Sequence, residues 1–334
     1  MDTELSEFKE ALRACKLVVV TGLRRYGKTS LILTGLNELG LNYVFLDCRL
    51  LPRPVTIGSI LKLLASELSR KSWASKVLSG IDGVSISPFG VSFRRADYGT
   101  LIDVIRALSS KVLVLDEAQE LRFFRYRLDS LLAYIYDHTD VKVVVSGSQV
   151  GVLYRSLRLK DPNSALYGRP YVEVRLKPLS RELAREFLIK GFEQEGIKPP
   201  YDLIEEAIEV FNGVIGWLTY FGFKYARLGV KDLRSMIEEA SKLALEELEH
   251  LLSIYGAGRV RYVEALKIVS TLSKARWSEI KRGIEAKLGK IPNNALMNIL
   301  RNLQDAGILR KDSEGYYRVT DPILNYAIKH YLRR

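Results

Sequence analysis

The residues best suited to do chemistry lie in a glycine-rich segment near the amino terminus. Residues 22–29, GLRRYGKT, fit the pattern G-x-x-x-x-G-K-[ST], follow the apolar run KLVVVT and open a segment of helical period. Such a loop turns its backbone N–H groups toward phosphates, while its lysine neutralises the β and γ oxygens and its hydroxyl binds Mg²⁺. The candidate phosphate-binding residues are Gly22, Arg24, Arg25, Tyr26, Gly27, Lys28, Thr29 and Ser30.

Two adjacent acids, Asp116 and Glu117, close a later apolar run, VLVL. Ligands of a parallel sheet bind beyond the carboxyl ends of its strands, which places both carboxylates beside the loop. Asp116 is predicted to hold Mg²⁺ with Thr29, and Glu117 to orient and polarise the water that attacks the γ-phosphoryl group. The alternative for Glu117 is an exposed acid that starts a helix, which would leave a site that binds ATP and hardly hydrolyses it.

Two further polar residues are candidates for contact with the γ-phosphate. Ser148 follows the run VVVSG and is preferred to Ser146 as a sensor of that phosphate, although small residues here also suit a simple turn. Arg169 precedes another apolar run and could reach the γ-phosphate in its own chain or from a neighbouring subunit, or be an ordinary surface arginine. Within the loop, Arg24 and Arg25 either brace the backbone or contact phosphate.

Residues 122–127, RFFRYR, interleave cations with aromatic rings. This composition is typical of surfaces that bind single-stranded nucleic acid. We favour the alternative, the front of an amphipathic helix that packs Phe123, Leu128, Leu131 and Leu132 against the sheet.

The elements that must position these residues form an α/β pattern from Lys16 to about Leu176. Short β-branched apolar runs alternate with helical stretches, as in a parallel sheet covered on both faces. Residues 79–95 alternate apolar and polar side chains around Pro-Phe-Gly and predict a β-hairpin insertion. The predicted strands of the sheet are Leu17–Thr21, Tyr43–Asp47, Val112–Asp116, Val141–Ser146 and Tyr171–Leu176.

The rest of the chain has a different pattern. Pro178-Leu179-Ser180 interrupts the core, and the following segments have helical period as far as Tyr255. After Gly256-Ala257-Gly258, three helical segments, two short strands and a last helix follow the plan of a winged helix-turn-helix. The predicted domains are therefore a P-loop core over 1–177, a helical lid over 178–257 and a winged helix over 258–334.

The net charge of +12 and the pI near 9.5 favour an anionic partner. Much of the excess lies between Arg261 and Arg334, which holds 15 Lys or Arg against 7 Asp or Glu. The helices of the turn are predicted at Trp277–Leu288 and Pro292–Ala306, and the wing at Leu309–Thr320. Duplex DNA and a protein partner both remain open, because the presumed recognition helix offers asparagines and a single cation, Arg301. The predicted phosphate contacts are Lys281, Arg282, Lys287, Lys290, Arg310, Lys311 and Arg318.

The segments GLRRYGKTSL, VLVLDEAQEL, VVVSGSQVGVL, LYGR and PLS together resemble the archaeal ATPase family of STAND-class NTPases, relatives of the AAA+ replication initiators. The resemblance covers essentially the whole chain. It implies an ASCE-type sheet of order 5-1-4-3-2, ATP or ADP with Mg²⁺, and a slow ATPase with Lys28, Thr29, Asp116 and Glu117 in the roles given above. One departure is Ile215, where the family usually has a proline in the lid, so the source of contacts to the base and ribose is open.

Several other classes of protein are not expected. Apolar runs such as 16–21 and 112–115 have strand length, whereas a bilayer span needs about 20 apolar residues. The first residues lack the pattern of a signal peptide, so the default expectation is a cytoplasmic protein without a membrane segment. Two cysteines and three scattered histidines predict neither a disulfide framework nor a zinc site.

Three functions fit these observations. The leading hypothesis is a switch in which ATP closes the lid, hydrolysis releases it and the winged helix reports the state to DNA or a protein. The alternatives are a DNA-binding regulator that holds nucleotide with negligible turnover, and a scaffold whose ATP-bound form assembles with itself or with other proteins.

Overall fold

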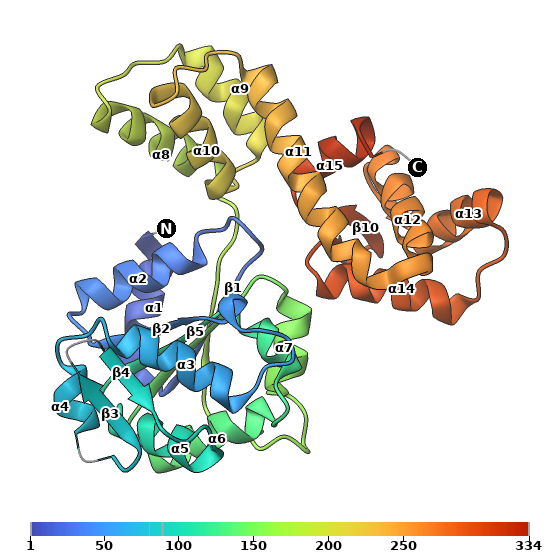
Figure 1. The fold of residues 1–334 in the computed structure, drawn as a ribbon. Helices are drawn as coiled ribbons and strands as arrows, with labels where there is room; N and C mark the ends of the chain where they lie inside the picture. The colour runs from blue at the N-terminus through green and yellow to red at the C-terminus, as the bar shows by residue number, and fades with distance from the viewer. Residues whose placement is uncertain (1, 80, 88–89, 333–334) are drawn as a thin grey trace. The chain divides into compact units, whose positions relative to one another are not determined.

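The computed structural model describes residues 2–79, 81–87 and 90–332. These residues form two compact units that meet in the chain between Leu176 and Lys177 (Figure 1). Among the helices of these residues, none combines the length and the apolar composition that a membrane span requires.

A five-stranded parallel sheet forms the centre of the first unit (Figure 1). Its order is β2-β5-β6-β1-β7, which is the predicted order 5-1-4-3-2 when these strands are numbered along the chain. The predicted strands are confirmed, with the ends of the last two shifted by one residue. The strands are β1 (Leu17–Thr21), β2 (Tyr43–Asp47), β5 (Val112–Asp116), β6 (Lys142–Gly147) and β7 (Val172–Arg175).

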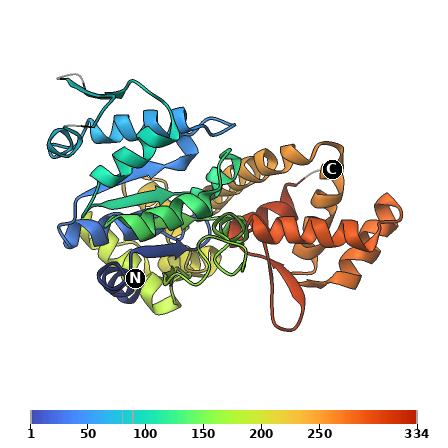
Figure 2. The same cartoon turned by 90° about the horizontal axis from the view of Figure 1, so that it is seen from below.

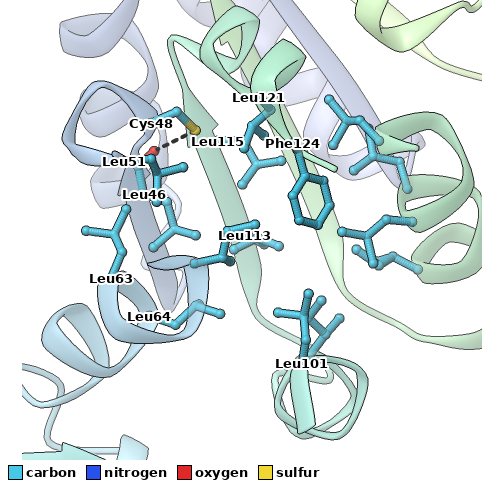
Figure 3. Close-up of a pocket in the computed structure, with 16 residues that line it drawn as sticks. Leu46, Cys48, Leu51, Leu63, Leu64, Leu101, Leu113, Leu115, Leu121 and Phe124 are labelled. Atoms are coloured by element: carbon cyan, nitrogen blue, oxygen red, sulfur yellow. Dashed lines mark hydrogen bonds between the residues drawn. The ribbon is translucent and has the colours of Figure 1, made fainter. Parts of the chain in front are cut away.

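Helices cover the sheet because its strands are apolar on both sides. Every residue of β1 and β5 is buried. On one side, leucines from the sheet and from the helices around it line a small apolar cavity of about 30 Å³ (Figure 3). The helices of this unit are α1 (Asp2–Ala14), α2 (Lys28–Glu38), α3 (Ile57–Leu68), α4 (Ala74–Leu78), α5 (Tyr98–Ala107), α6 (Leu128–His138) and α7 (Val150–Leu157), with short 3₁₀ helices at Cys48–Leu50 and Ala118–Phe123.

The predicted hairpin insertion is present as β3 (Val84–Ser87) and β4 (Gly90–Phe93), which pair antiparallel. Pro88 and Phe89, at the expected turn, lie outside the described residues. The hairpin lies at the periphery of the unit beside α3 (Figures 1 and 2). It is an addition to the sheet of the core.

The second unit contains the predicted helical segment and the winged helix. The wing has three strands rather than the predicted two, because β8 adds to β10 in the order β8-β10-β9. Its elements are α8 (Arg181–Gln194), α9 (Tyr201–Phe211), α10 (Ile215–Ala226), α11 (Leu233–Leu252), a 3₁₀ turn (Ser253–Gly258), α12 (Arg259–Thr271), β8 (Ala275–Arg276), α13 (Trp277–Leu288), α14 (Asn293–Asp305), β9 (Leu309–Lys311), β10 (Tyr316–Val319) and α15 (Pro322–His330).

One polar contact fastens the winged helix to the preceding helices. The indole Nε1 of Trp217, in α10, lies 3.0 and 3.1 Å from the carboxylate oxygens of Asp321. The same carboxylate accepts hydrogen bonds from the first backbone N–H groups of α15, which packs along α11. The two parts therefore share one unit here, and a division into domains near residue 257 stays a prediction.

Gly213 occupies the tightest backbone contact of the second unit, and its replacement gives the first prediction. Its φ is +72°, and a Cβ would lie 2.0 Å from the carbonyl oxygen of Leu179. Gly229 has a similar φ of +68° with open space in front of it. We expect Gly229→Ala to lower the free energy of unfolding by about 1–2 kcal/mol, the cost of the left-handed conformation. Gly213→Ala adds a backbone collision, so we expect a loss of roughly 3 kcal/mol or more.

Urea unfolding of the two variants and the wild type measures both values, with the m-value checking that the transitions are comparable. Equal losses in the two variants would contradict the role given to the contact between Gly213 and Leu179.

Candidate active site

The glycine-rich loop joins β1 to α2, and its backbone shape depends on two glycines. Gly27 has a φ of +81° and stands at the N-cap of α2, where no side chain caps the helix. Gly22 packs so closely that a Cβ would lie 3.0 Å from Cβ of Leu176. The first N–H groups of α2 are thus directed outward with the positive end of the helix dipole, which suits phosphate oxygens.

Lys28, the first residue of α2, is buried with 5% of its side chain exposed. Its Nζ donates to the carbonyl oxygens of Gly22 at 2.9 Å and Leu23 at 3.0 Å, and lies 3.9 Å from Oε1 of Glu117. Burial lowers the pKa of Lys28 because it disfavours the ammonium form, and the charge of Glu117 opposes that shift. The ammonium group is therefore held inside the loop, between its carbonyls and an acid.

Asp116 and Thr29 form a pair of oxygen ligands beside the lysine. The hydroxyl of Thr29 donates to Asp116 Oδ2 at 2.9 Å, and the hydroxyl of Ser146 donates to Asp116 Oδ1. Hydroxyl and carboxylate oxygens suit Mg²⁺, which usually takes one or two protein ligands and completes its shell with phosphates and water. This donor set fits Mg²⁺. In the described part of the chain, no group of three His, Cys, Asp or Glu residues could hold a metal by itself.

Glu117 follows β5 in a left-handed conformation, with a φ of +50°, that is uncommon outside glycine. Its Oε2 accepts hydrogen bonds from Ser148 Oγ at 2.5 Å, Ser148 N at 3.3 Å and Gln119 Nε2 at 2.5 Å. Burial on its own would raise the pKa of Glu117, but the charge of Lys28 and these hydrogen bonds outweigh it, so the pKa lies below its usual value. Glu117 is therefore ionised at neutral pH and can accept a hydrogen bond from water.

Comparison with known proteins places this geometry in a family. A model described as an AAA domain matches residues 11–155, and one described as the MCM protein C-terminal winged helix-turn-helix domain matches residues 257–320. The chain is 31% identical to the Walker-type ATPase paby2304 of Pyrococcus abyssi, with a TM-score of 0.82 over 98% of this chain and 95% of that chain. The chain belongs to the AAA+ Walker-type ATPases with a C-terminal winged helix.

The relationship to AAA+ proteins predicted from the motifs is thus confirmed, whereas membership of the STAND class stays a prediction. The ORC2 protein of Aeropyrum pernix, solved in ADPNP–ADP complexes, has a TM-score of 0.63 at 14% identity over 98% of this chain and 91% of that chain, which shows a shared fold. None of the curated proteins matches the chain in sequence.

The structure of this AAA+ ATPase brings most of the predicted site residues together and adds two. The hydroxyl of Ser148 donates to Glu117, and the hydroxyl of Ser146, the less favoured candidate, donates to Asp116. Sensing of the γ-phosphate by Ser148 stays a prediction. Gln119 was missed altogether, although a polar residue two positions after Glu117 was visible in the DEAQ segment.

In the loop itself, Tyr26 is buried, Arg25 is half-buried, and Arg24 and Ser30 are exposed. Contact of these four side chains with phosphate stays a prediction.

Arg169 is the predicted site residue that the structure does not bring to the loop. Its guanidinium forms two hydrogen bonds with the carboxylate of Asp137, at 3.0 and 2.5 Å, and a third with the carbonyl of Ala165. Asp137 lies in the last turn of α6, just before β6, and Arg169 precedes β7, so both lie at the amino edge of the sheet. The loop follows the carboxyl end of β1 at the other edge. Contact between Arg169 and a neighbouring subunit stays a prediction.

The arginine-rich segment of this AAA+ ATPase differs in part from the favoured interpretation. Leu128, Leu131 and Leu132 are buried as predicted, but α6 begins only at Leu128. The 3₁₀ helix before it ends at Phe123, so residues 124–127 lie in neither helix. Phe124 is buried, whereas Phe123 packs against the core but is only partly buried. The guanidinium groups of Arg53 and Arg122 lie 4.5 and 4.7 Å from the centroid of the Phe123 ring. The interpretation as a surface for single-stranded nucleic acid stays a prediction.

Proposed function

We propose that this AAA+ ATPase binds ATP with Mg²⁺ at the glycine-rich loop, hydrolyses it slowly, and couples its nucleotide state to duplex DNA through the winged helix. One observation supports the hydrolytic site above all. At the N-terminus of α2, Thr29 and Asp116 lie 2.9 Å apart while Lys28 and Glu117 lie 3.9 Å apart. The cation of Lys28, a pair of oxygen ligands for a metal and the ionised Glu117 therefore lie together at the N-terminus of a helix, which is suited to bind an anion.

Each group has a distinct part in the reaction. The N–H groups of α2 and the ammonium of Lys28 bind the β- and γ-phosphates and offset the charge that develops on them. Thr29 and Asp116 would hold Mg²⁺, which would supply positive charge to offset that of the phosphates. Glu117 accepts a hydrogen bond from the attacking water and aligns it with the γ-phosphorus. As the water oxygen bonds to the γ-phosphorus, the bond from that phosphorus to the bridging oxygen breaks, a proton of the water passes to Glu117, and ADP and inorganic phosphate are the products.

The winged helix offers exposed polar and basic groups for a nucleic acid. Asn294, Met297, Asn298 and Arg301 form the exposed side of α14, a set able to meet base edges and a thymine methyl. Three of the seven predicted phosphate contacts form hydrogen bonds or ion pairs among the described residues: Lys281 with Asn293 and Glu285, Lys287 with Glu264, and Arg318 with Asp312. The others, Arg282, Lys290, Arg310 and Lys311, are exposed. The ammonium group of Lys311 lies 5.5 Å from the centroid of the Tyr317 ring.

The experiment that tests this function is steady-state phosphate release with Mg²⁺, with and without duplex DNA, together with DNA binding at several salt concentrations. The protein is compared as wild type and as Arg310→Ala/Lys311→Ala, which removes two exposed cations of the wing. We expect DNA to stimulate the wild type, and the variant to bind DNA at least about tenfold more weakly with a salt slope lower by roughly 2. Lys198→Ala, an exposed lysine outside the winged helix, is the matched control.

Tight nucleotide binding without any turnover would overturn hydrolysis and leave a nucleotide-bound regulator. Unchanged DNA binding by the wing variant would overturn the assignment of the winged helix to DNA.

A further inference from the structure

Gln119 is a buried polar residue between the ends of β5 and β6 that the mechanism above does not use. It is 3% exposed. Its Nε2 donates to Glu117 Oε2 at 2.5 Å and lies 3.5 Å from Ser148 Oγ. Its Oε1 is also buried and has no hydrogen-bond partner among the described residues.

This arrangement is unfavourable for stability, because a buried amide oxygen without a partner has lost its hydration without compensation. A leucine is of comparable size and would bury no unsatisfied oxygen. The orientation of the amide is fixed nonetheless, because a flip would turn Oε1 of Gln119 against the carboxylate of Glu117. What the amide supplies is therefore its contact with Glu117 rather than stability of the fold.

Gly147 gives a second, independent sign that this contact matters. Its φ is not in the left-handed region, so the backbone conformation does not require glycine. A Cβ at this position would lie 2.7 Å from Gln119 Oε1 and 3.0 Å from Leu153 Cδ2. On either side of Gly147, the hydroxyl of Ser146 donates to Asp116 and the hydroxyl of Ser148 donates to Glu117. The glycine between them leaves room for the amide of Gln119, which also donates to Glu117.

We propose that Gln119 is a positioning residue that, together with Ser148, fixes Oε2 of Glu117 so that Oε1 is presented to the attacking water. Three hydrogen bonds from Gln119 and Ser148 occupy Oε2. Oε1 lies 3.9 Å from Nζ of Lys28, on the side of the phosphate-binding loop. The inference rests on the proposed function of Glu117, and it adds the groups that decide which of its oxygens meets the water.

The test compares kcat, KM, ATP affinity and thermal stability for Gln119→Leu, Gln119→Ala, Gly147→Ala and the double variant Gln119→Ala/Gly147→Ala. We expect Gln119→Leu to lower kcat at least about tenfold while KM and ATP affinity stay unchanged, because the leucine leaves the loop intact and frees Glu117. Its thermal stability should equal or exceed that of the wild type, since the unsatisfied oxygen is gone. A structural role would lower stability and activity together.

Gly147→Ala should lower kcat in a similar way, because its Cβ pushes the amide away from Glu117. In the double variant the amide is absent, so the second substitution should add little to the effect of Gln119→Ala. Gly191→Ala, in a helix and facing open space, is the control for adding a methyl group at a glycine.

Wild-type kcat in Gln119→Leu, or a loss of ATP affinity and stability in proportion to kcat, would overturn the proposal. Additive effects in the double variant would overturn the role of Gly147. Turnover of Glu117→Gln, measured in parallel, distinguishes failure of the positioning role of Gln119 from failure of the proposed function of Glu117. If that variant is inactive while Gln119→Leu is fully active, the positioning role alone fails, whereas a fully active Glu117→Gln overturns the proposed function as well.

Discussion

Glu117→Gln is expected to bind ATP as tightly as the wild type and to hydrolyse it at least about a hundredfold more slowly, since a positioned general base contributes about 10²–10⁴ to a rate. Glutamine preserves the shape of the side chain and leaves Lys28, Thr29 and Asp116 in place. It removes the negative charge that attracts the protons of water, and its amide nitrogen would face the hydrogen-bond donors of Ser148 and Gln119. The measurement is single-turnover hydrolysis beside equilibrium nucleotide binding.

The chain offers a matched control three residues further on. Glu120 has the same exposed fraction of side chain as Glu117, 14%, but its carboxylate pairs with Arg53 at 2.5 Å instead of facing the loop. Glu120→Gln should therefore leave the rate within about threefold of the wild type, because the carboxylate of Glu120 contacts Arg53 and takes no part in the chemistry. A Glu117→Gln protein that turns over like Glu120→Gln would remove Glu117 from the mechanism.

The sheet could be predicted closely because a strand covered on both faces must be apolar at nearly every position. All five residues of β1 and of β5 are buried, so the sequence displays them as uninterrupted runs. The short strand β8 gives no such signal. Its two residues, Ala275 and Arg276, become a strand because they pair with Tyr317 and Tyr316, and that pairing depends on the tertiary fold.

The position of a site residue could be predicted where it follows directly from the end of a strand. It could not be predicted where the contact depends on the local conformation of the backbone. Asp116 ends a central strand and Lys28 opens the helix after another, and the direction of both strands fixes the place of these residues. Gln119 meets Glu117 because Glu117 adopts a φ of +50°, a conformation that glutamate rarely takes and that no motif indicates. Arg169 illustrates the opposite case, since a residue before a parallel strand belongs at the amino edge, away from the loop after β1.

Lys28→Met is expected to abolish tight ATP binding without unfolding the protein. The ammonium group would form charge-assisted hydrogen bonds with the phosphates, each contributing about 1.5–3 kcal/mol, so their loss corresponds to a roughly hundredfold or greater rise in Kd. Burial already opposes the charged form of Lys28, which lowers its pKa. Methionine fills a similar volume without that cost, but it leaves the buried carboxylate of Glu117 without its cation, so the nucleotide-free protein should stay folded with a lower thermal stability.

Lys16 is the matched control for this substitution, because its Nζ also donates to two carbonyl oxygens, those of Tyr136 at 3.3 Å and Thr139 at 2.7 Å. It precedes β1 and so lies at the amino edge of the sheet, where no phosphate is expected. Calorimetric titration with ATP and Mg²⁺ should give wild-type affinity for Lys16→Met and severe loss for Lys28→Met. Equal affinities in the two variants would show that the cation inside the loop does not bind phosphate, and would leave the N–H groups of α2 as the sole anchor of the nucleotide.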